Sequence, residues 1–294
     1  MENTLLAIPQ GIILGGAYGA IALGLSVIFG VTRVINFAQG SMLMASCFLY
    51  YVLYENYGID PYIGIIAVAP IMFLFGYAVQ KFLVKPLIIR ERASVIEPTS
   101  VMMMTIGFDF ALMYLFMMIF GASYRTIKTT ASGIVVKTAD GMFTTTLSRI
   151  IALIAGLVLA FALWFIFNKT ELGTKIRAVA QNRTAAGLCG VDVFKSYSIA
   201  FGLGVAALAV SGACLLQFLY AQPNMGTMFG VKSFMIVVLG GLGSIPGALI
   251  GGVIFGVVET VGAQLITGTA ATMLSFVLFI IVLVVKPTGL FGKK

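Results

Sequence analysis

Long apolar stretches alternate with short polar connections along most of this chain. An α-helix needs roughly 20 mostly apolar residues to cross the hydrocarbon core of a bilayer. Six stretches of about that length precede residue 222, at about 5–31, 37–54, 61–82, 98–120, 148–167 and 197–221. The pattern predicts six membrane-spanning helices in this part of the chain.

The remainder of the chain is also apolar, but it is interrupted. Residues 233–285 contain the sequence GGLGSIPG at Gly240–Gly247, where glycine and proline oppose a continuous helix. We expect two or three shorter helices here, with broken or re-entrant ones among them. The predicted fold class is an all-α polytopic integral membrane protein with about eight membrane helices, roughly seven to nine, in one domain over residues 1–294.

The composition excludes several classes of protein. Of the 294 residues, 60% are hydrophobic and 10% are charged, whereas a soluble domain averages about 25% charged residues. The net charge of +8 does not indicate nucleic-acid binding, because the basic residues lie in connections rather than along one face. The sequence has no histidine, and its three cysteines lack metal-ligand spacing, so it predicts no metal site and no disulfide scaffold.

The basic residues predict the orientation in the membrane, because cytoplasmic connections are rich in lysine and arginine. Three basic groups are expected in the cytoplasm: Lys81, Lys85, Arg90 and Arg92; Lys169, Lys175, Arg177, Arg183 and Lys195; and Lys286, Lys293 and Lys294. The link with Glu55 and Asp60 and the N-terminus then lie outside; a broken first helix would place the N-terminus inside.

Residues 121–147 are expected to form an external loop, although Arg125, Lys128 and Lys137 oppose this placement. Val135 and Val136 with the later Gly141 are compatible with a small hairpin over the outer mouth of a pore. From the sequence, a simple connecting loop is favoured over the hairpin.

An alanine-rich polar segment, residues 171–190, separates two apolar stretches. Alanine favours helix, Asn182 can end one helix or cap the next, and Gly190 can terminate a helix in the left-handed conformation. We expect a short surface helix within a cytoplasmic loop over residues 171–193. Its small side chains suit insertion into a groove of a partner protein, and a solvated amphipathic loop is the alternative from the residues alone.

Four groups of residues form a recognisable set along the chain. They are NFAQG at Asn36–Gly40, preceded by Gly19, Gly24 and Gly30; Gly173, RAVAQN at Arg177–Asn182, Ala185, Ala186 and Gly190; GGLGSIPGA at Gly240–Ala248; and KPTGLFG at Lys286–Gly292. In order and spacing this set resembles the motifs of the permeases of ATP-binding-cassette importers for branched-chain amino acids. The resemblance covers nearly the whole chain and implies one transmembrane permease domain in the bacterial cytoplasmic (inner) membrane.

The resemblance also implies partners. These are a second homologous permease subunit, two ATP-binding-cassette ATPase subunits and an external solute-binding protein that delivers the substrate. The chain has no G-x-x-x-x-G-K-[ST] phosphate loop, so ATP and Mg²⁺ are expected on the ATPase subunits and no cofactor on this chain. The residues expected to couple to the ATPase are Glu171, Gly173, Arg177, Ala178, Ala180, Asn182, Ala185, Ala186 and Gly190.

Other residues are candidates for the translocation pathway or its gate. Breaks in membrane helices are tolerated where the backbone is buried or lines a cavity, and carboxylates within apolar spans suggest a role. The candidates are Asn36, Phe37, Gly40, Gly240, Gly241, Gly243, Pro246, Gly247, Asp109 and Glu259. Glu259 fits the family pattern, whereas Asp109 stands where an uncharged residue is expected. Tight packing of small residues and structural pairing of the two carboxylates are the alternatives.

Three other functions compete with the import of hydrophobic amino acids. A permease of the same family can serve urea or short amides, and a self-sufficient channel or ion-coupled carrier would need no ATPase. An intramembrane enzyme would require a nucleophile with a base, or a metal site. Because the chain has no histidine and no acidic pair in one span, the sequence predicts a transport subunit and not an enzyme.

Overall fold

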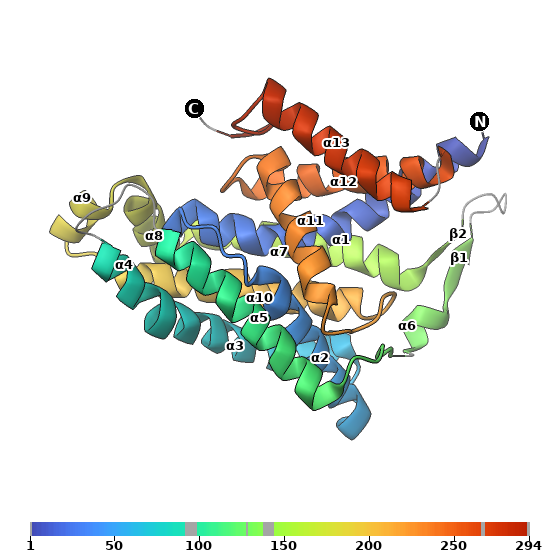
Figure 1. Cartoon of the computed structure of the whole chain (residues 1–294), viewed down its shortest axis with the longest axis horizontal. Coiled ribbons are helices and arrows are strands. Elements are labelled where there is room, and N and C mark those ends of the chain that lie inside the picture. The colour runs from blue at the N-terminus through green and yellow to red at the C-terminus, as the bar shows by residue number, and fades with distance from the viewer. Residues whose placement is uncertain (1, 92–98, 128, 138–143, 266–267, 293–294) are drawn as a thin grey trace.

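The computed structural model describes residues 2–91, 99–127, 129–137, 144–265 and 268–292. Arg92, Lys128, Gly141, Lys293 and Lys294, which entered the charge and hairpin predictions, lie outside these residues. The described part is almost entirely helical (Figure 1), so the predicted all-α class is confirmed.

The described elements follow one another along the chain in the order given next. They are α1 (Glu2–Thr32), α2 (Gln39–Tyr57), α3 (Pro61–Val79), the π-helical turn η1 (Gln80–Val84), α4 (Lys85–Glu91), α5 (Thr99–Phe120), α6 (Thr130–Gly133), β1 (Val135–Lys137), β2 (Thr144–Thr146), α7 (Leu147–Lys169), α8 (Glu171–Gln181), α9 (Arg183–Leu188), α10 (Val193–Leu215), α11 (Met225–Gly240), α12 (Ile245–Leu265) and α13 (Gly268–Val285).

Six helices within the described residues are long and apolar enough to cross a membrane. They are Ala7–Thr32, Pro61–Arg90, Thr99–Phe120, Leu147–Lys169, Val193–Leu215 and Ile245–Leu265, and the shorter apolar helices are Met225–Gly240 and Thr272–Val285. The prediction of two or three helices after the sixth stretch is confirmed, because α11, α12 and α13 lie there. Only α12 among these three reaches full spanning length.

The predicted span at 37–54 forms helix α2, but α2 is not in the group of long apolar helices. Its sequence mixes serine, tyrosine, glutamine and glutamate with apolar residues, and most of its N-terminal two thirds is buried inside the protein. The sequence pattern located this helix correctly. It did not show that the apolar residues of the helix pack against protein rather than lipid.

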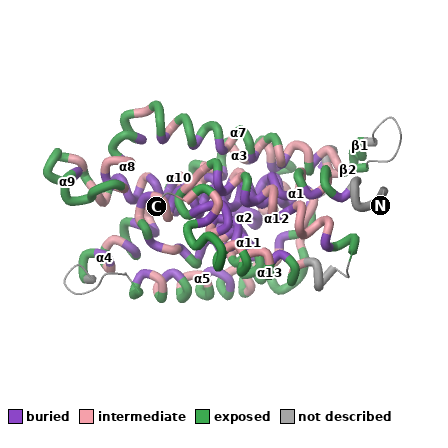
Figure 2. The backbone as a smooth tube through the Cα atoms, turned by 90° about the horizontal axis from the view of Figure 1, so that it is seen from above, coloured by how far each residue is buried: buried purple, intermediate pink, exposed green. Residues whose placement is uncertain are grey.

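The core forms around α1 and α10, and each has 78% of its most apolar window buried. In α5, only 17% is buried, and the exposed residues follow its outer face (Figure 2). Small residues allow α1 and α12 to approach closely, as is common between membrane helices: a Cβ on Gly15 would lie 2.5 Å from Val253 Cα. Helices α1 and α10 therefore form the centre of the protein, whereas most of α5 is exposed on its outside.

The two ends of the molecule differ in charge. Helices α4, α8 and α9 lie at one end with the C-terminal segment, whereas the N-terminus and the β1–β2 hairpin lie at the other (Figure 1). The described members of all three basic groups therefore share one end, as the predicted orientation requires. The small hairpin, which the sequence allowed but did not favour over a simple connecting loop, does form, because β1 and β2 pair antiparallel with Val135 opposite Thr146.

Candidate functional site

A sharp, partly buried connection joins α1 to α2. Helix α1 ends at Thr32, and Arg33 adopts a left-handed conformation with φ of 55°. The side chain of Asn36 is buried, and its Oδ1 accepts a hydrogen bond from the backbone N of Ala38 at 3.1 Å. This side chain closes the turn that starts α2, so Asn36 has a structural role at the predicted motif.

Side chains of α5 accept hydrogen bonds from backbone amides at the start of α2. The backbone N of Phe37 donates to Thr105 Oγ1 at 3.3 Å, and that of Ser41 donates to Asp109 Oδ1 at 3.2 Å. Thr105 and Asp109 lie four residues apart and therefore on one face of α5. A carboxylate is stabilised at a helix N-terminus by the free amides and the helix dipole, which explains how α5 accommodates Asp109.

Helix α2 crosses α11 next to this carboxylate. A Cβ on Gly40 would lie 1.9 Å from the carbonyl O of Gly226, so glycine is required for the two backbones to touch. Gly40 thus acts through packing, which was the alternative to a place in the pathway.

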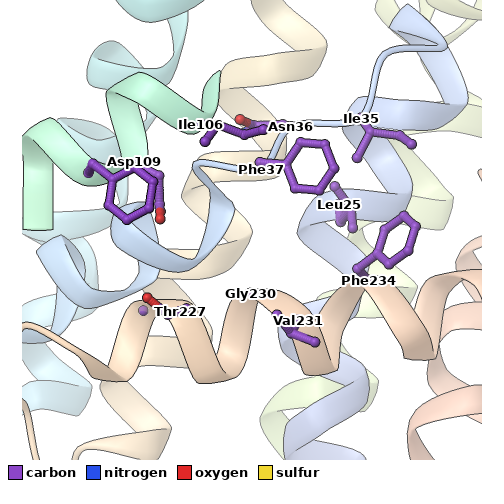
Figure 3. A pocket seen from close by; sticks show the side chains of 12 residues that line it. Leu25, Ile35, Asn36, Phe37, Ile106, Asp109, Thr227, Gly230, Val231 and Phe234 are labelled. Carbon is purple, nitrogen blue, oxygen red and sulfur yellow. The ribbon is translucent and has the colours of Figure 1, made fainter. Parts of the chain in front are cut away.

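A cavity of about 180 Å³ lies between the α1–α2 connection, α5 and α11. It brings together Asn36, Phe37 and Asp109, which the sequence had singled out separately (Figure 3). Its other walls include Phe110, Thr227 and Phe234, which sequence reasoning missed because nothing distinguishes them from neighbouring apolar and small residues. The rings of Phe37 and Phe234 lie 6.3 Å apart.

Glu259 lies elsewhere, in the packed interface between α11 and α12. Its Oε1 is 2.6 Å from Lys232 Nζ, and the side chains are 16% and 4% exposed. Lys232 also donates to the hydroxyl of Tyr18 on α1 at 3.1 Å. Among the described residues, Glu259 Oε2 has no hydrogen-bond partner. Glu259 therefore forms a structural ion pair, which was one of the two roles that the sequence allowed. Its partner Lys232 is a single lysine in an apolar stretch, and sequence reasoning did not identify it.

The glycine-proline break forms the turn between α11 and α12 and contacts the C-terminal segment. Gly241 and Gly243 have φ of 104° and 82°. The backbone N of Leu290 donates to Leu239 O at 2.9 Å, and that of Phe291 donates to Gly240 O at 3.1 Å. The two C-terminal motifs are thus bound to each other. Gly240 and Gly247 also pack directly against one another.

Gly243 and Pro246 line a second cavity, of about 330 Å³, which also contacts Trp164 on α7 and Arg177 on α8. This cavity shares no lining residue with the first one. The break therefore lies beside the polar segment 171–190, at the basic end of the molecule, rather than at the Asp109 cavity.

The polar segment forms two helices instead of the single one expected. Asn182 ends α8, and its Oδ1 accepts hydrogen bonds from the backbone N of Thr184 and of Ala185, both at 3.0 Å, which caps α9. Gly190 follows with φ of 80°. Both residues therefore do what their sequence positions suggested.

Several predicted coupling residues contact their own chain. Ala186 was expected to meet a partner surface, but it is 5% exposed and lies in the core cluster. Arg177 donates to Phe167 O and to Asn168 Oδ1 at the end of α7. A Cβ on Gly173 would lie 2.3 Å from Phe167 O. Gly173, Arg177 and Ala186 thus hold the segment against the membrane helices.

The outward surface of the segment consists of other residues. Glu171 and Ala185 are exposed, Ala178 and Ala180 are half-buried, and Leu188 is 86% exposed. Sequence reasoning did not single out Leu188, because a leucine among alanines is common in any helix. The carbonyl O of Ala180 accepts from Arg33 Nη2 at 3.4 Å, which connects the segment to the α1–α2 connection.

Comparisons with known proteins agree along nearly the whole chain. The model of a family described as "Branched-chain amino acid transport system / permease component" matches residues 7–284. The "High-affinity branched-chain amino acid transport system permease protein BraD" of Pseudomonas aeruginosa is 29% identical over 295 residues, 97% of this chain and 94% of that protein. The protein of the same description named LivH, from Escherichia coli K12, is 29% identical over 299 residues, with the same coverage.

A solved structure supports the fold. PsaBC from Streptococcus pneumoniae, in complex with Fab, matches with a TM-score of 0.51 and 12% sequence identity, over 96% of this chain and 93% of that chain. At this identity the likeness concerns the polytopic helical fold alone.

Proposed function

Because the chain belongs to the family of permease components of branched-chain amino acid transport systems, we propose that it translocates branched-chain or other hydrophobic amino acids. A family match over residues 7–284 carries this proposal. In the proposed importer, an external solute-binding protein delivers the amino acid and separate ATPase subunits supply the energy. The apolar walls of the Asp109 cavity agree with such a substrate.

The proposed assembly pairs this chain with a second permease, a homologue or another copy, and with two cytoplasmic ATPases. The absence of a phosphate loop from the sequence supports a separate energy source. In this assembly, α8 and α9 dock on an ATPase, and the exposed Leu188 enters a groove of its surface. The residues buried behind them transmit the displacement to the membrane helices.

Arg33 offers a route for that displacement. Its guanidinium binds the carbonyl of Ala180 on α8, and its backbone starts the connection that contributes Ile35, Asn36 and Phe37 to the Asp109 cavity. A shift of α8 is therefore passed to the cavity wall through one short segment. Alternating access requires that such a segment adopt two positions, one for each state of the transporter.

Uptake of labelled leucine tests the substrate. Cells with and without the chain are compared at low leucine concentration, with isoleucine, valine, other amino acids, urea and short amides as competitors. We expect uptake to depend on the chain and to be inhibited by the branched aliphatic amino acids. Unchanged uptake in the deletion strain would refute the substrate, and inhibition by urea or amides alone would assign those solutes instead.

Leu188→Arg tests the docking of α9. We expect uptake to be lost while the chain still inserts in the membrane, because the arginine cannot enter an apolar groove without losing its hydration. Tyr57→Arg is the matched control, since Tyr57 is 73% exposed at the end of α2 away from the segment. Normal uptake by the Leu188 variant would refute the docking assignment and leave the substrate assignment standing.

A further inference from the structure

The Asp109 cavity combines one carboxylate with aromatic and aliphatic walls. Phe37, Phe110 and Phe234 line it together with Ile35 and Ile106, and Asp109 is its acidic residue (Figure 3). These residues come from the α1–α2 connection, α5 and α11, so three separate parts of the sequence build the site.

Among the described residues, the hydrogen-bond partner of Asp109 is Ser41. Oδ1 of Asp109 accepts from the backbone N of Ser41 at 3.2 Å, the side chain of Ser41 also interacts with the carboxylate, and Asp109 lines the cavity. The ion pair found within the described residues joins Lys232 to Glu259. The carboxylate of Asp109 therefore has no cationic partner in the described part of the chain.

Such a carboxylate calls for a positive ligand. An ionised group within a membrane span faces protein or a water-filled cavity and pairs with an opposite charge. The faces of phenylalanine rings also attract cations, and three such side chains line the same cavity as the carboxylate. A ligand with one positive group and an apolar remainder complements both features.

The size of the cavity limits the apolar part. A dry apolar cavity of about 150 Å³ is large enough to hold benzene, and this cavity has about 180 Å³. A branched side chain of four carbons fits this volume. Urea and neutral amides, by contrast, would leave the carboxylate without an ion partner.

We propose that the cavity is a substrate subsite in which Asp109 binds the ammonium group of an aliphatic amino acid or amine, with the apolar part against Phe37 and Phe234. The inference rests on the proposed function and narrows it, because it selects ammonium-bearing substrates over urea and amides. Asp109 is then a specificity-determining residue in addition to its hydrogen bond with α2.

Occupancy of the cavity is measured directly with a cysteine at Thr227, an exposed lining residue on α11. In the purified permease assembly, with the exposed Cys189 replaced by serine, the rate of Thr227→Cys modification by a charged thiol reagent is followed. Leucine, 3-methylbutylamine, 4-methylpentanoate and 4-methylpentanamide are the probes. We expect the two ammonium compounds to slow the reaction at least threefold and the other two to leave it unchanged.

The same measurement is repeated with Asp109→Asn, which keeps an oxygen acceptor for the Ser41 amide but removes the charge. We expect this variant to lose the protection while it assembles normally. Asp60→Asn is the matched control, because Asp60 accepts from the Tyr62 amide at the start of α3 at 2.9 Å and lies outside the cavity. That variant should retain full protection.

Three outcomes overturn the proposal. Equal protection by the carboxylate, the amide and the amine would show that charge plays no part, and no protection by any probe would show that the cavity binds none of them. Loss of assembly in the Asp109→Asn variant would show that the charge of the carboxylate serves the structure of the permease instead of the substrate. Leucine uptake by the unaltered importer is scored separately, so a failure of the subsite is distinguishable from a failure of the proposed function.

Discussion

The buried ion pair between Lys232 and Glu259 allows a decision between a structural and a pathway role for Glu259. The charged atoms lie 2.6 Å apart with side chains 4% and 16% exposed. Removal of one partner leaves the other charge buried and unpaired, which costs about 3–5 kcal/mol. Glu259→Gln and Lys232→Met should therefore each destabilise the chain by about that amount.

The double variant, Lys232→Met with Glu259→Gln, separates the contribution of the pair from that of each residue. Replacement of both members of a buried ion pair by neutral groups is often close to neutral in stability. The double variant should thus be more stable than either single variant, with a coupling free energy of at least about 2 kcal/mol.

Two readouts check this reasoning. One is the midpoint of thermal unfolding of the purified chain in detergent, and the other is leucine uptake normalised to the amount of folded protein. Glu55→Gln is the control, because Glu55 is an exposed carboxylate at the end of α2. The structural role predicts lower midpoints with nearly normal normalised uptake. A Glu259→Gln variant of unchanged stability and tenfold lower uptake would refute it and place Glu259 in the pathway.

Three further predictions concern packing and coupling. Arg33→Ala removes the hydrogen bond to Ala180, and a bond worth about 1 kcal/mol corresponds to a fall in uptake of about fivefold. Substrate-independent ATPase activity should persist. An equal loss of uptake and of ATPase activity would contradict the transmission route. Gly40→Val should abolish the folded chain in the membrane, because even a Cβ there would overlap a carbonyl of α11; normal yield on size-exclusion chromatography would contradict this. Gly173→Ala should displace α8 from α7 and lower uptake with insertion intact, and unchanged uptake would show that the close approach is dispensable.

Local and compositional properties of this protein could be predicted from its sequence. The length of each apolar stretch sets helix length, because the bilayer thickness fixes how many residues a span needs. The basic groups at Lys85, Lys175 and Lys286 lie at one end of the molecule, as the orientation rule requires. Asn182 and Gly190 signal their helix ends through local backbone chemistry that needs no tertiary contact.

Tertiary structure alone decided which of the candidate residues meet. Asp109 and Phe37 are 72 residues apart in sequence, yet they line one cavity because α5 binds the start of α2. Glu259 does not line this cavity, because it forms an ion pair with Lys232. Ala186 is buried, whereas Leu188, two residues later, is exposed. Periodicity assigns a residue to a helix, but the packing partner of each face is set by contacts between distant segments, and no local pattern records them.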